Sequence, residues 1–176
     1  IAITGSIGKT TFKENIYHIL KNNSFKTYRS FKNYNNILGL QFSIMNLKIN
    51  TDYSIFELGI NRSNEMTNLV KTLRPHYVLV TGIENSHIGN FRNFRHLIYN
   101  KLKIFNSDRL ISGLLNYNYD PTYVKSKLYP KVKLININNI NKSSIKIQKK
   151  YIISFSHSNK NYRIESFRGS FYENIA

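Results

Sequence analysis

The chain has 176 residues, enough for one domain with a real hydrophobic core, and 41% of them are hydrophobic, including 13 Tyr and 11 Phe. This composition excludes a disordered basic tail, although 26 Lys and Arg against 9 Asp and Glu give a formal net charge of +17. The absence of cysteine excludes disulfides, thiolate zinc sites and cysteine nucleophiles, and no apolar run reaches the roughly 18 residues of a membrane span.

Short apolar runs alternate with amphipathic stretches, which is typical of a parallel sheet with crossover helices. In chain order, the sequence predicts a strand over 1–4, a helix over 9–22, an aromatic-rich loop over 25–36 with a short strand at its start, a helix over 37–47, a strand over 53–58, a helix over 63–73, a strand over 76–81, a helix over 93–106, a strand over 109–115, a helix over 120–128 and a strand over 131–137. Segments 144–148, 151–156 and 161–166 predict a small antiparallel β appendage on the main sheet. We therefore expect a three-layer α/β domain with a mostly parallel sheet flanked by helices, as one domain over 1–176.

A phosphate-binding loop is predicted between the first strand and the first helix, in the run Thr4-Gly5-Ser6-Ile7-Gly8-Lys9-Thr10-Thr11. Its glycines let backbone N–H groups approach phosphates, and the helix that begins near Lys9 directs its positive dipole end at the anion. Lys9 can reach the β and γ phosphates, and the Thr10 hydroxyl can bind Mg²⁺. The alternative is an ordinary strand–helix turn. We expect a P-loop with a nucleotide bound by residues 5–11.

Two further candidates follow strands. Glu57 ends the strand predicted over 53–58, and His87 lies in the loop after the strand over 76–81. The carboxyl ends of parallel strands meet at one edge, so both residues should lie near the phosphate loop. A buried carboxylate is costly unless it is paired or binds a cation, and Mg²⁺ prefers oxygen ligands. The alternatives are a lysine ion pair for Glu57 and a solvated loop position for His87.

Lys101 lies on the apolar stripe of the helix predicted over 93–106. Its neighbours at helical spacing are Phe94, Leu97, Ile98 and Phe105. Partial burial there would lower the pKa of Lys101 and free its amine. The alternative is a packed stem whose ammonium reaches water.

These motifs resemble the central ATP-binding domain of the Mur ligase family. The phosphate loop has the form Gly-Ser-x-Gly-Lys-Thr-Thr and continues into Phe12-Lys13-Glu14, and further blocks follow in the family's order. They are Asn33-Tyr34-Asn35-Asn36-Ile37-Leu38-Gly39-Leu40, Glu57-Leu58-Gly59-Ile60-Asn61 with Glu65, Thr81 and Ile83 with Ser86-His87-Ile88, Lys101, Asn116 with Asp120, and Gly169 with Asn174-Ile175-Ala176. Because the resemblance covers essentially the whole chain and the chain begins at Ile1, we expect it to be part of a longer protein, with a UDP-substrate domain before it and a further domain after it.

Within the family, the blocks are most similar to members that add D-alanyl-D-alanine to UDP-N-acetylmuramoyl-tripeptide in peptidoglycan precursor synthesis. The resemblance implies that ATP phosphorylates the tripeptide carboxylate and that the D-alanyl-D-alanine amine attacks the acyl phosphate. It assigns catalytic roles to Lys9, His87 and Lys101, metal binding to Thr10, Glu57, His87 and Lys101, and an adenine contact to Asn174. It also implies that Lys101 adds CO₂ and, as a carbamate, binds a second Mg²⁺ beside His87.

Several positions depart from the family's pattern. Ile7 replaces an Asn of the phosphate loop, Lys32 replaces the Gly before the Asn-rich block, and Gly82 replaces the Asn after Thr81. Arg95 and Lys103 stand where Glu is usual, and the closing block is one residue short and lacks its His. Asn33, Asn35 and Asn36 either shape the site or form turns. The alternatives for function are another Mur ligase step, a folylpolyglutamate synthase-like ligase, or a non-catalytic nucleotide- or nucleic-acid-binding relative.

The positive charge has three possible origins: the composition of an AT-rich genome, attraction of polyanionic small substrates, or nucleic-acid binding. The basic residues are dispersed along the chain, and no base-reading motif accompanies them. We therefore expect no specific nucleic-acid partner, and we expect a cytoplasmic monomer.

Overall fold

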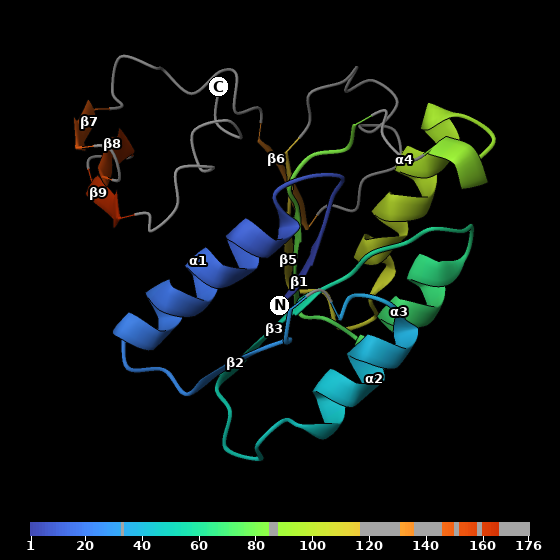
Figure 1. The fold of residues 1–176 in the computed structure, drawn as a ribbon, viewed down its shortest axis with the longest axis horizontal. Helices are drawn as coiled ribbons and strands as arrows, with labels where there is room; N and C mark the ends of the chain where they lie inside the picture. The colour runs from blue at the N-terminus through green and yellow to red at the C-terminus, as the bar shows by residue number, and fades with distance from the viewer. Residues whose placement is uncertain are drawn as a thin grey trace. The chain divides into compact units, whose positions relative to one another are not determined.

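A six-stranded parallel sheet organises the first of two compact units, Ile1–Ile135 and Asn136–Ala176. The computed structural model describes residues 1–32, 34–84, 88–116, 131–135, 146–149, 152–157 and 160–165 (Figure 1). The strands of the first sheet are β1 (Ala2–Thr4), β2 (Thr27–Arg29), β3 (Tyr53–Glu57), β4 (Tyr77–Val80), β5 (Ser112–Asn116) and β6 (Val132–Ile135). Their spatial order is β2-β3-β1-β4-β5-β6, and every pairing between neighbours is parallel.

The order of the strands places β1 at the point where the chain changes direction across the sheet. The chain leaves β1, forms β2 and β3 on one side, and then crosses β1 to form β4 on the other side. Ligands of open α/β sheets bind at such a switch point, beyond the carboxyl ends of the strands. The loop after β1 therefore has the ends of β3 and β4 on either side.

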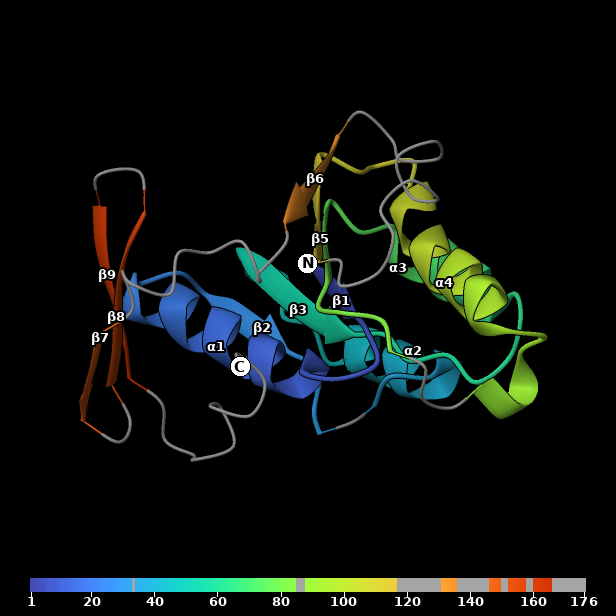
Figure 2. The ribbon, with the colours of Figure 1, turned by 90° about the horizontal axis from the view of Figure 1, so that it is seen from above.

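Helices cover both faces of this sheet. They are α1 (Lys9–Asn22), α2 (Ile37–Met45), α3 (Glu65–Leu73) and α4 (Phe94–Leu102), with the 3₁₀ turns η1 (Ile88–Asn90) and η2 (Lys103–Asn106). Figures 1 and 2 show α1 on one face and α2, α3 and α4 on the other. In the part of the chain that the structure describes, no helix combines the length and the hydrophobicity of a membrane span.

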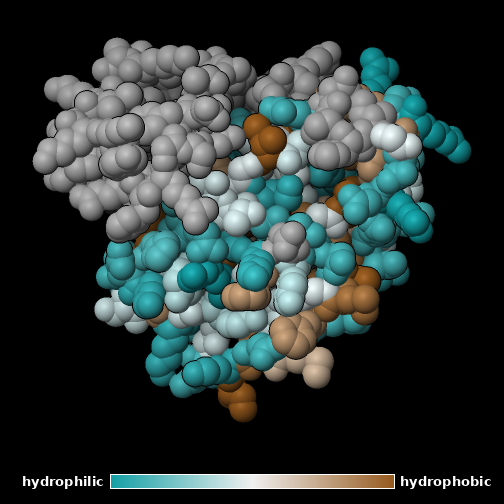
Figure 3. All heavy atoms as spheres, viewed as in Figure 1, coloured by the Kyte–Doolittle hydropathy of each residue, from teal (hydrophilic) through white to brown (hydrophobic). Residues whose placement is uncertain are grey.

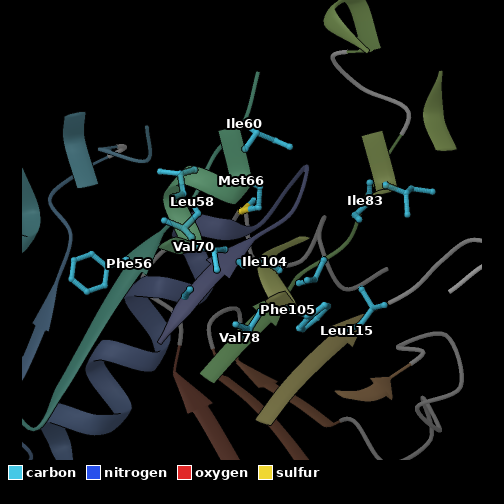
Figure 4. Packing of buried hydrophobic residues seen from close by; sticks show 14 of the residues in the cluster. Phe56, Leu58, Ile60, Met66, Val70, Val78, Ile83, Ile104, Phe105 and Leu115 are labelled. Carbon is cyan, nitrogen blue, oxygen red and sulfur yellow. The ribbon is translucent and has the colours of Figure 1, made fainter. Parts of the chain in front are cut away.

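The hydrophobic core gathers strand and helix side chains, and Figure 4 shows part of it. Its largest buried members include Phe56 of β3, Met66 and Leu69 of α3, and Phe105 of η2. The outer side of α2 differs, because Leu38, Phe42 and Met45 are exposed there. Figure 3 shows apolar side chains at the surface over this part of the molecule.

The predicted elements of the first unit are largely confirmed, and the boundaries differ for local reasons. The helix predicted over 93–106 is α-helical only to Leu102 and then tightens into η2. It begins after Asn93, whose Oδ1 accepts from the amide of His96 at 2.9 Å. The strand predicted from residue 109 starts at Ser112, because Leu110 still belongs to a turn and donates to the carbonyl of Ser107. The helix predicted over 120–128 lies outside the described residues.

The second unit contains a three-stranded antiparallel sheet, β7 (Lys146–Lys149), β8 (Ile152–His157) and β9 (Lys160–Glu165). Strands β8 and β9 pair over their full length, from Ile152 opposite Glu165 to His157 opposite Lys160. That these strands form an appendage of the main sheet, within one domain, stays a prediction.

Candidate nucleotide and metal site

The phosphate loop joins the end of β1 to the start of α1 through two glycines. Gly8 has a φ of +76°, a left-handed conformation that favours glycine, and in the described part of the chain no side chain caps the helix that begins after it. A Cβ at Gly5 would overlap the hydroxyl of Thr81. Both positions therefore require glycine, and the uncapped start of α1 is suited to an anion.

Contacts with the ends of β4 and β5 fix the backbone of this loop. The amide of Ser6 donates to the carbonyl of Gly82 at 2.7 Å, and the Thr81 hydroxyl donates to the carbonyl of Ile7 at 2.6 Å. Asn116 in turn donates to the carbonyl of Thr81 at 2.7 Å. The side chain of Ile7 is 43% exposed, so this position contributes to the fixed loop through its backbone.

Two lysines converge on one carbonyl of the loop. Lys9 Nζ donates to the carbonyls of Gly5 at 3.1 Å and Ser6 at 3.3 Å, and Lys101 Nζ donates to the same Gly5 oxygen at 3.0 Å. Lys101 is only 6% exposed, as the apolar stripe of its helix predicts. Burial, and secondly the positive charge of Lys9, lowers the pKa of Lys101 from 10.5 to about 8. The positive charge gathered here suits a polyanion such as a nucleotide phosphate.

Glu57 lies beside the loop at the carboxyl end of β3. Its Oε2 accepts from the hydroxyl of Thr10 at 2.7 Å, and its Oε1 accepts from the amide of Asn35 at 3.1 Å. The residue is 2% exposed, and among the described residues no lysine or arginine forms an ion pair with it. A buried carboxylate whose described partners are neutral donors is suited to a cation, and its oxygens and the Thr10 hydroxyl are ligands that Mg²⁺ prefers.

Several residues that the sequence singled out lie outside the described residues: Asn33, Ser86, His87, Asp120, Gly169, Asn174, Ile175 and Ala176. Their assigned roles stay predictions. Thr11 lies in the first turn of α1. Within the described ranges, no three His, Asp or Glu side chains come together as a metal cluster. The structure thus brings Gly5, Ser6, Ile7, Gly8, Lys9 and Thr10 together with Glu57 and Lys101.

Lys13 is a part of this region that sequence reasoning did not assign to the site. Its side chain is fully buried, and its Nζ donates to the carbonyls of Ser30 at 3.1 Å and Lys32 at 2.7 Å. A signal was present, because Lys13, Ile16 and Leu20 recur at helical spacing on one side of α1. A lysine in such a stripe is a candidate for a buried, hydrogen-bonded ammonium.

Comparisons with known proteins find relatives of this chain. The family model of the Mur ligase middle domain matches residues 3–175. Two curated relatives are UDP-N-acetylmuramoyl-tripeptide–D-alanyl-D-alanine ligases. The one from Borreliella burgdorferi is 35% identical over 138 residues, covering 77% of this chain and 30% of the relative. The one from Buchnera aphidicola subsp. Baizongia pistaciae is 33% identical over 175 residues, covering 98% and 37%. The chain thus spans about a third of the length of these relatives.

Solved structures share the fold. A crystal structure of MurF from Acinetobacter baumannii superposes with a TM-score of 0.76 at 22% identity, covering 99% of this chain and 40% of that one. MurF ligase from Thermotoga maritima in complex with ADP gives a TM-score of 0.70 at 21% identity, covering 99% and 42%. The predicted α/β architecture with a mostly parallel sheet is therefore confirmed.

Proposed function

The chain belongs to the Mur ligase family as a middle domain, and from this premise we propose that it is the ATP-binding part of a ligase that adds D-alanyl-D-alanine to UDP-N-acetylmuramoyl-tripeptide. The names of the curated relatives favour this reaction over another Mur ligase step or a folylpolyglutamate synthase-like reaction. The observation that carries the proposal is the contact of 2.7 Å between Thr10 of the phosphate loop and Glu57 of the neighbouring strand.

The loop residues would bind the phosphates of ATP through their backbone and through Lys9. The Lys9 ammonium donates hydrogen bonds to the carbonyls of Gly5 and Ser6. It can exchange these for stronger charge-assisted hydrogen bonds to phosphate oxygens. The solved MurF complex with ADP supports nucleotide binding by this fold. Because Lys9, Thr10, Glu57 and Lys101 come from one chain, we expect a monomer to hold the site.

Thr10 and Glu57 would hold a magnesium ion. The buried carboxylate and the hydroxyl offer oxygen donors, with no described cation in ion-pair contact with Glu57. When bound, the ion supplies charge neutralisation for the phosphates. We propose His87 as a further ligand, and Asn174 as an adenine contact.

The reaction must bring two anions together, the γ-phosphate and a substrate carboxylate. A carboxylate oxygen attacks the γ-phosphorus and ADP leaves; the D-alanyl-D-alanine amine then attacks the acyl carbon, and phosphate leaves. The ammonium of Lys9 would stabilise the charge on the transferred group. Because the proposed reaction uses ATP and a UDP-linked substrate, we propose a cytoplasmic location.

Lys101 would be carboxylated in the working enzyme. Its buried amine lies at the loop, 3.0 Å from the Gly5 oxygen, and its lowered pKa of about 8 provides the free amine that adds CO₂. The modification replaces an ammonium by an anionic oxygen ligand, which suits a second magnesium ion.

The proposal is tested by the change Lys9→Ala. We expect the affinity for ATP with Mg²⁺ to fall by about 10- to 100-fold, as for the loss of a charge-assisted hydrogen bond, and ligase turnover to be lost. Calorimetry on the full-length protein measures the first and phosphate release the second. The matched control is Lys21→Ala, at the far end of α1, which should leave both unchanged. If Lys9→Ala binds and turns over ATP like the wild type, the loop does not bind nucleotide as proposed.

A further inference from the structure

We propose that Lys13 is a positioning residue of the magnesium site, acting through the segment between β2 and α2 on Asn35, which orients the Glu57 carboxylate. The inference rests on the proposed function, because it concerns the same metal site. Neither Lys13 nor Asn35 touches the phosphate loop or the reacting groups in the described contacts. Their effect is through Glu57.

The first step is the burial of Lys13. The side chain has no exposed surface, and its ammonium is close to three acceptors: the carbonyls of Ser30 and Lys32 and the carboxylate of Glu14 at 3.6 Å. Burying an ammonium is very costly unless hydrogen bonds replace water, so Lys13 requires these carbonyls to remain in place. The lysine of α1 therefore holds the backbone of the segment that follows β2.

The second step is the anchoring of that segment to β3. The amide of Ser30 donates to the carbonyl of Ile55 at 2.9 Å, and the Ser30 hydroxyl accepts from the amide of Glu57 at 3.3 Å. Further along, the amide of Gly59 donates to the carbonyl of Asn35 at 2.9 Å. A Cβ at Gly59 would come within 2.9 Å of the Asn35 side chain, so the backbone of Gly59 lies directly against Asn35. The segment is held on both sides of Glu57.

The third step is the orientation of the carboxylate. Asn35 donates to one oxygen of Glu57 and Thr10 to the other, so two donors fix the plane of the group. Without the Asn35 bond, the carboxylate can rotate about its last torsion, and the Thr10 bond alone does not fix it. Partners that orient a metal ligand typically contribute 10- to 100-fold to metal affinity.

A competing explanation is that Lys13 serves only the stability of the fold. Removal of the lysine would then lower the thermal midpoint without changing the magnesium dependence of nucleotide binding. If Lys13 is a positioning residue, its removal changes the magnesium dependence of nucleotide binding, and this change requires Asn35. The two explanations are separated by measuring both residues and their combination.

The test uses Lys13→Met, Asn35→Ala and the double variant in the full-length protein, with Lys21→Met as the matched control on the exposed end of α1. Calorimetric titration with ADP over a range of Mg²⁺ gives the magnesium concentration at half-saturation. We expect it to rise about 10-fold in each single variant and no further in the double variant. ADP affinity in EDTA should stay within about 2-fold of the wild type.

Amide hydrogen exchange of the protein without metal or nucleotide supplies an independent readout. Lys13→Met should speed exchange in residues 30–32 and 34–36, and at the amide of Gly59, which donates to the carbonyl of Asn35. Asn35→Ala changes a half-buried side chain and decides the last step even where Lys13→Met does not fold.

The inference is overturned if the magnesium concentration at half-saturation stays within about 2-fold of the wild type in either single variant. It is also overturned if the double variant shows the product of the two single effects. If the wild type binds no ADP under any condition, the proposed function fails instead. Hydrogen exchange then still decides whether Lys13 holds the segment.

Discussion

The buried ammonium of Lys101 should destabilise the folded protein at neutral pH, and Lys101→Met should remove that penalty. The pKa of Lys101 is lowered from 10.5 to about 8 in the fold, first by burial and then by the charge of Lys9. The unfolded chain keeps the proton up to pH 10.5, whereas the folded chain releases it near pH 8. The unfolded state therefore binds more protons between these values, and stability rises with pH in this window.

The size of the effect follows from the same two pKa values. One pH unit of difference corresponds to about 1.4 kcal/mol, so the penalty is about 3 kcal/mol below pH 8 and vanishes near pH 10.5. The free energy of unfolding of Lys101→Met minus that of the wild type should therefore fall by about 3 kcal/mol as the pH rises from 7 to 10.5. Methionine cannot donate the hydrogen bond to Gly5. This loss shifts the difference in free energy of unfolding by the same amount at every pH and does not change its dependence on pH.

Urea unfolding followed by circular dichroism measures this difference, because the chain has no Trp to report by fluorescence. The titration is done without nucleotide, metal or CO₂, so that the amine is unmodified. Ionisation of the 13 Tyr above pH 9 affects wild type and variant alike and cancels in their difference. Lys21→Met, an exposed change on α1, should run parallel to the wild type. If Lys101→Met also runs parallel within about 0.5 kcal/mol, Lys101 is not the buried, weakly basic lysine inferred here.

Two other outcomes follow from the site and from the charge. Lys101→Ala should abolish ligase turnover, and added formate or acetate should restore part of it by filling the position of the carbamate; full turnover without them would contradict the carboxylated lysine. The net charge of +17 should give only weak binding to DNA that falls steeply with salt, as titrations at 50 and 200 mM would show, whereas tight, sequence-selective binding near physiological salt would contradict the dispersed distribution of the basic residues.

The elements and the phosphate loop were predictable because their causes are local. Gly8, Lys9 and Thr10 follow a short apolar run, and this order alone places a glycine-rich turn before a helix. The strand ending at Glu57 was visible from its apolar residues, and the sheet rule then placed it near the loop. The burial of Lys101 followed from helical spacing, which is also a property of neighbouring residues.

The partners of these residues were not predictable, because they are distant in sequence. Lys101 and the Gly5 carbonyl are separated by 96 residues, and Asn35 and Glu57 by 22. Apolar spacing indicates that a side chain is buried but does not specify which carbonyl it meets. Lys13 shows this limit: its stripe on α1 could be seen, whereas the segment it holds becomes apparent only when β2 pairs beside β3.

The distribution of charge at the site is itself an argument for its function. With 26 basic and 9 acidic residues, a carboxylate of this chain would readily meet a lysine. Yet Glu57 is bonded to a hydroxyl and an amide, while Lys9 and Lys101 converge on a neutral carbonyl. A direct ion pair between them would satisfy both signs of charge and leave little attraction for a ligand. The acid lies at the end of β3, whereas the two cations lie on α1 and α4. By keeping these charges unpaired, the fold leaves the carboxylate available to a metal cation and the ammonium of Lys9 available to phosphate, as the proposed reaction between two anions requires.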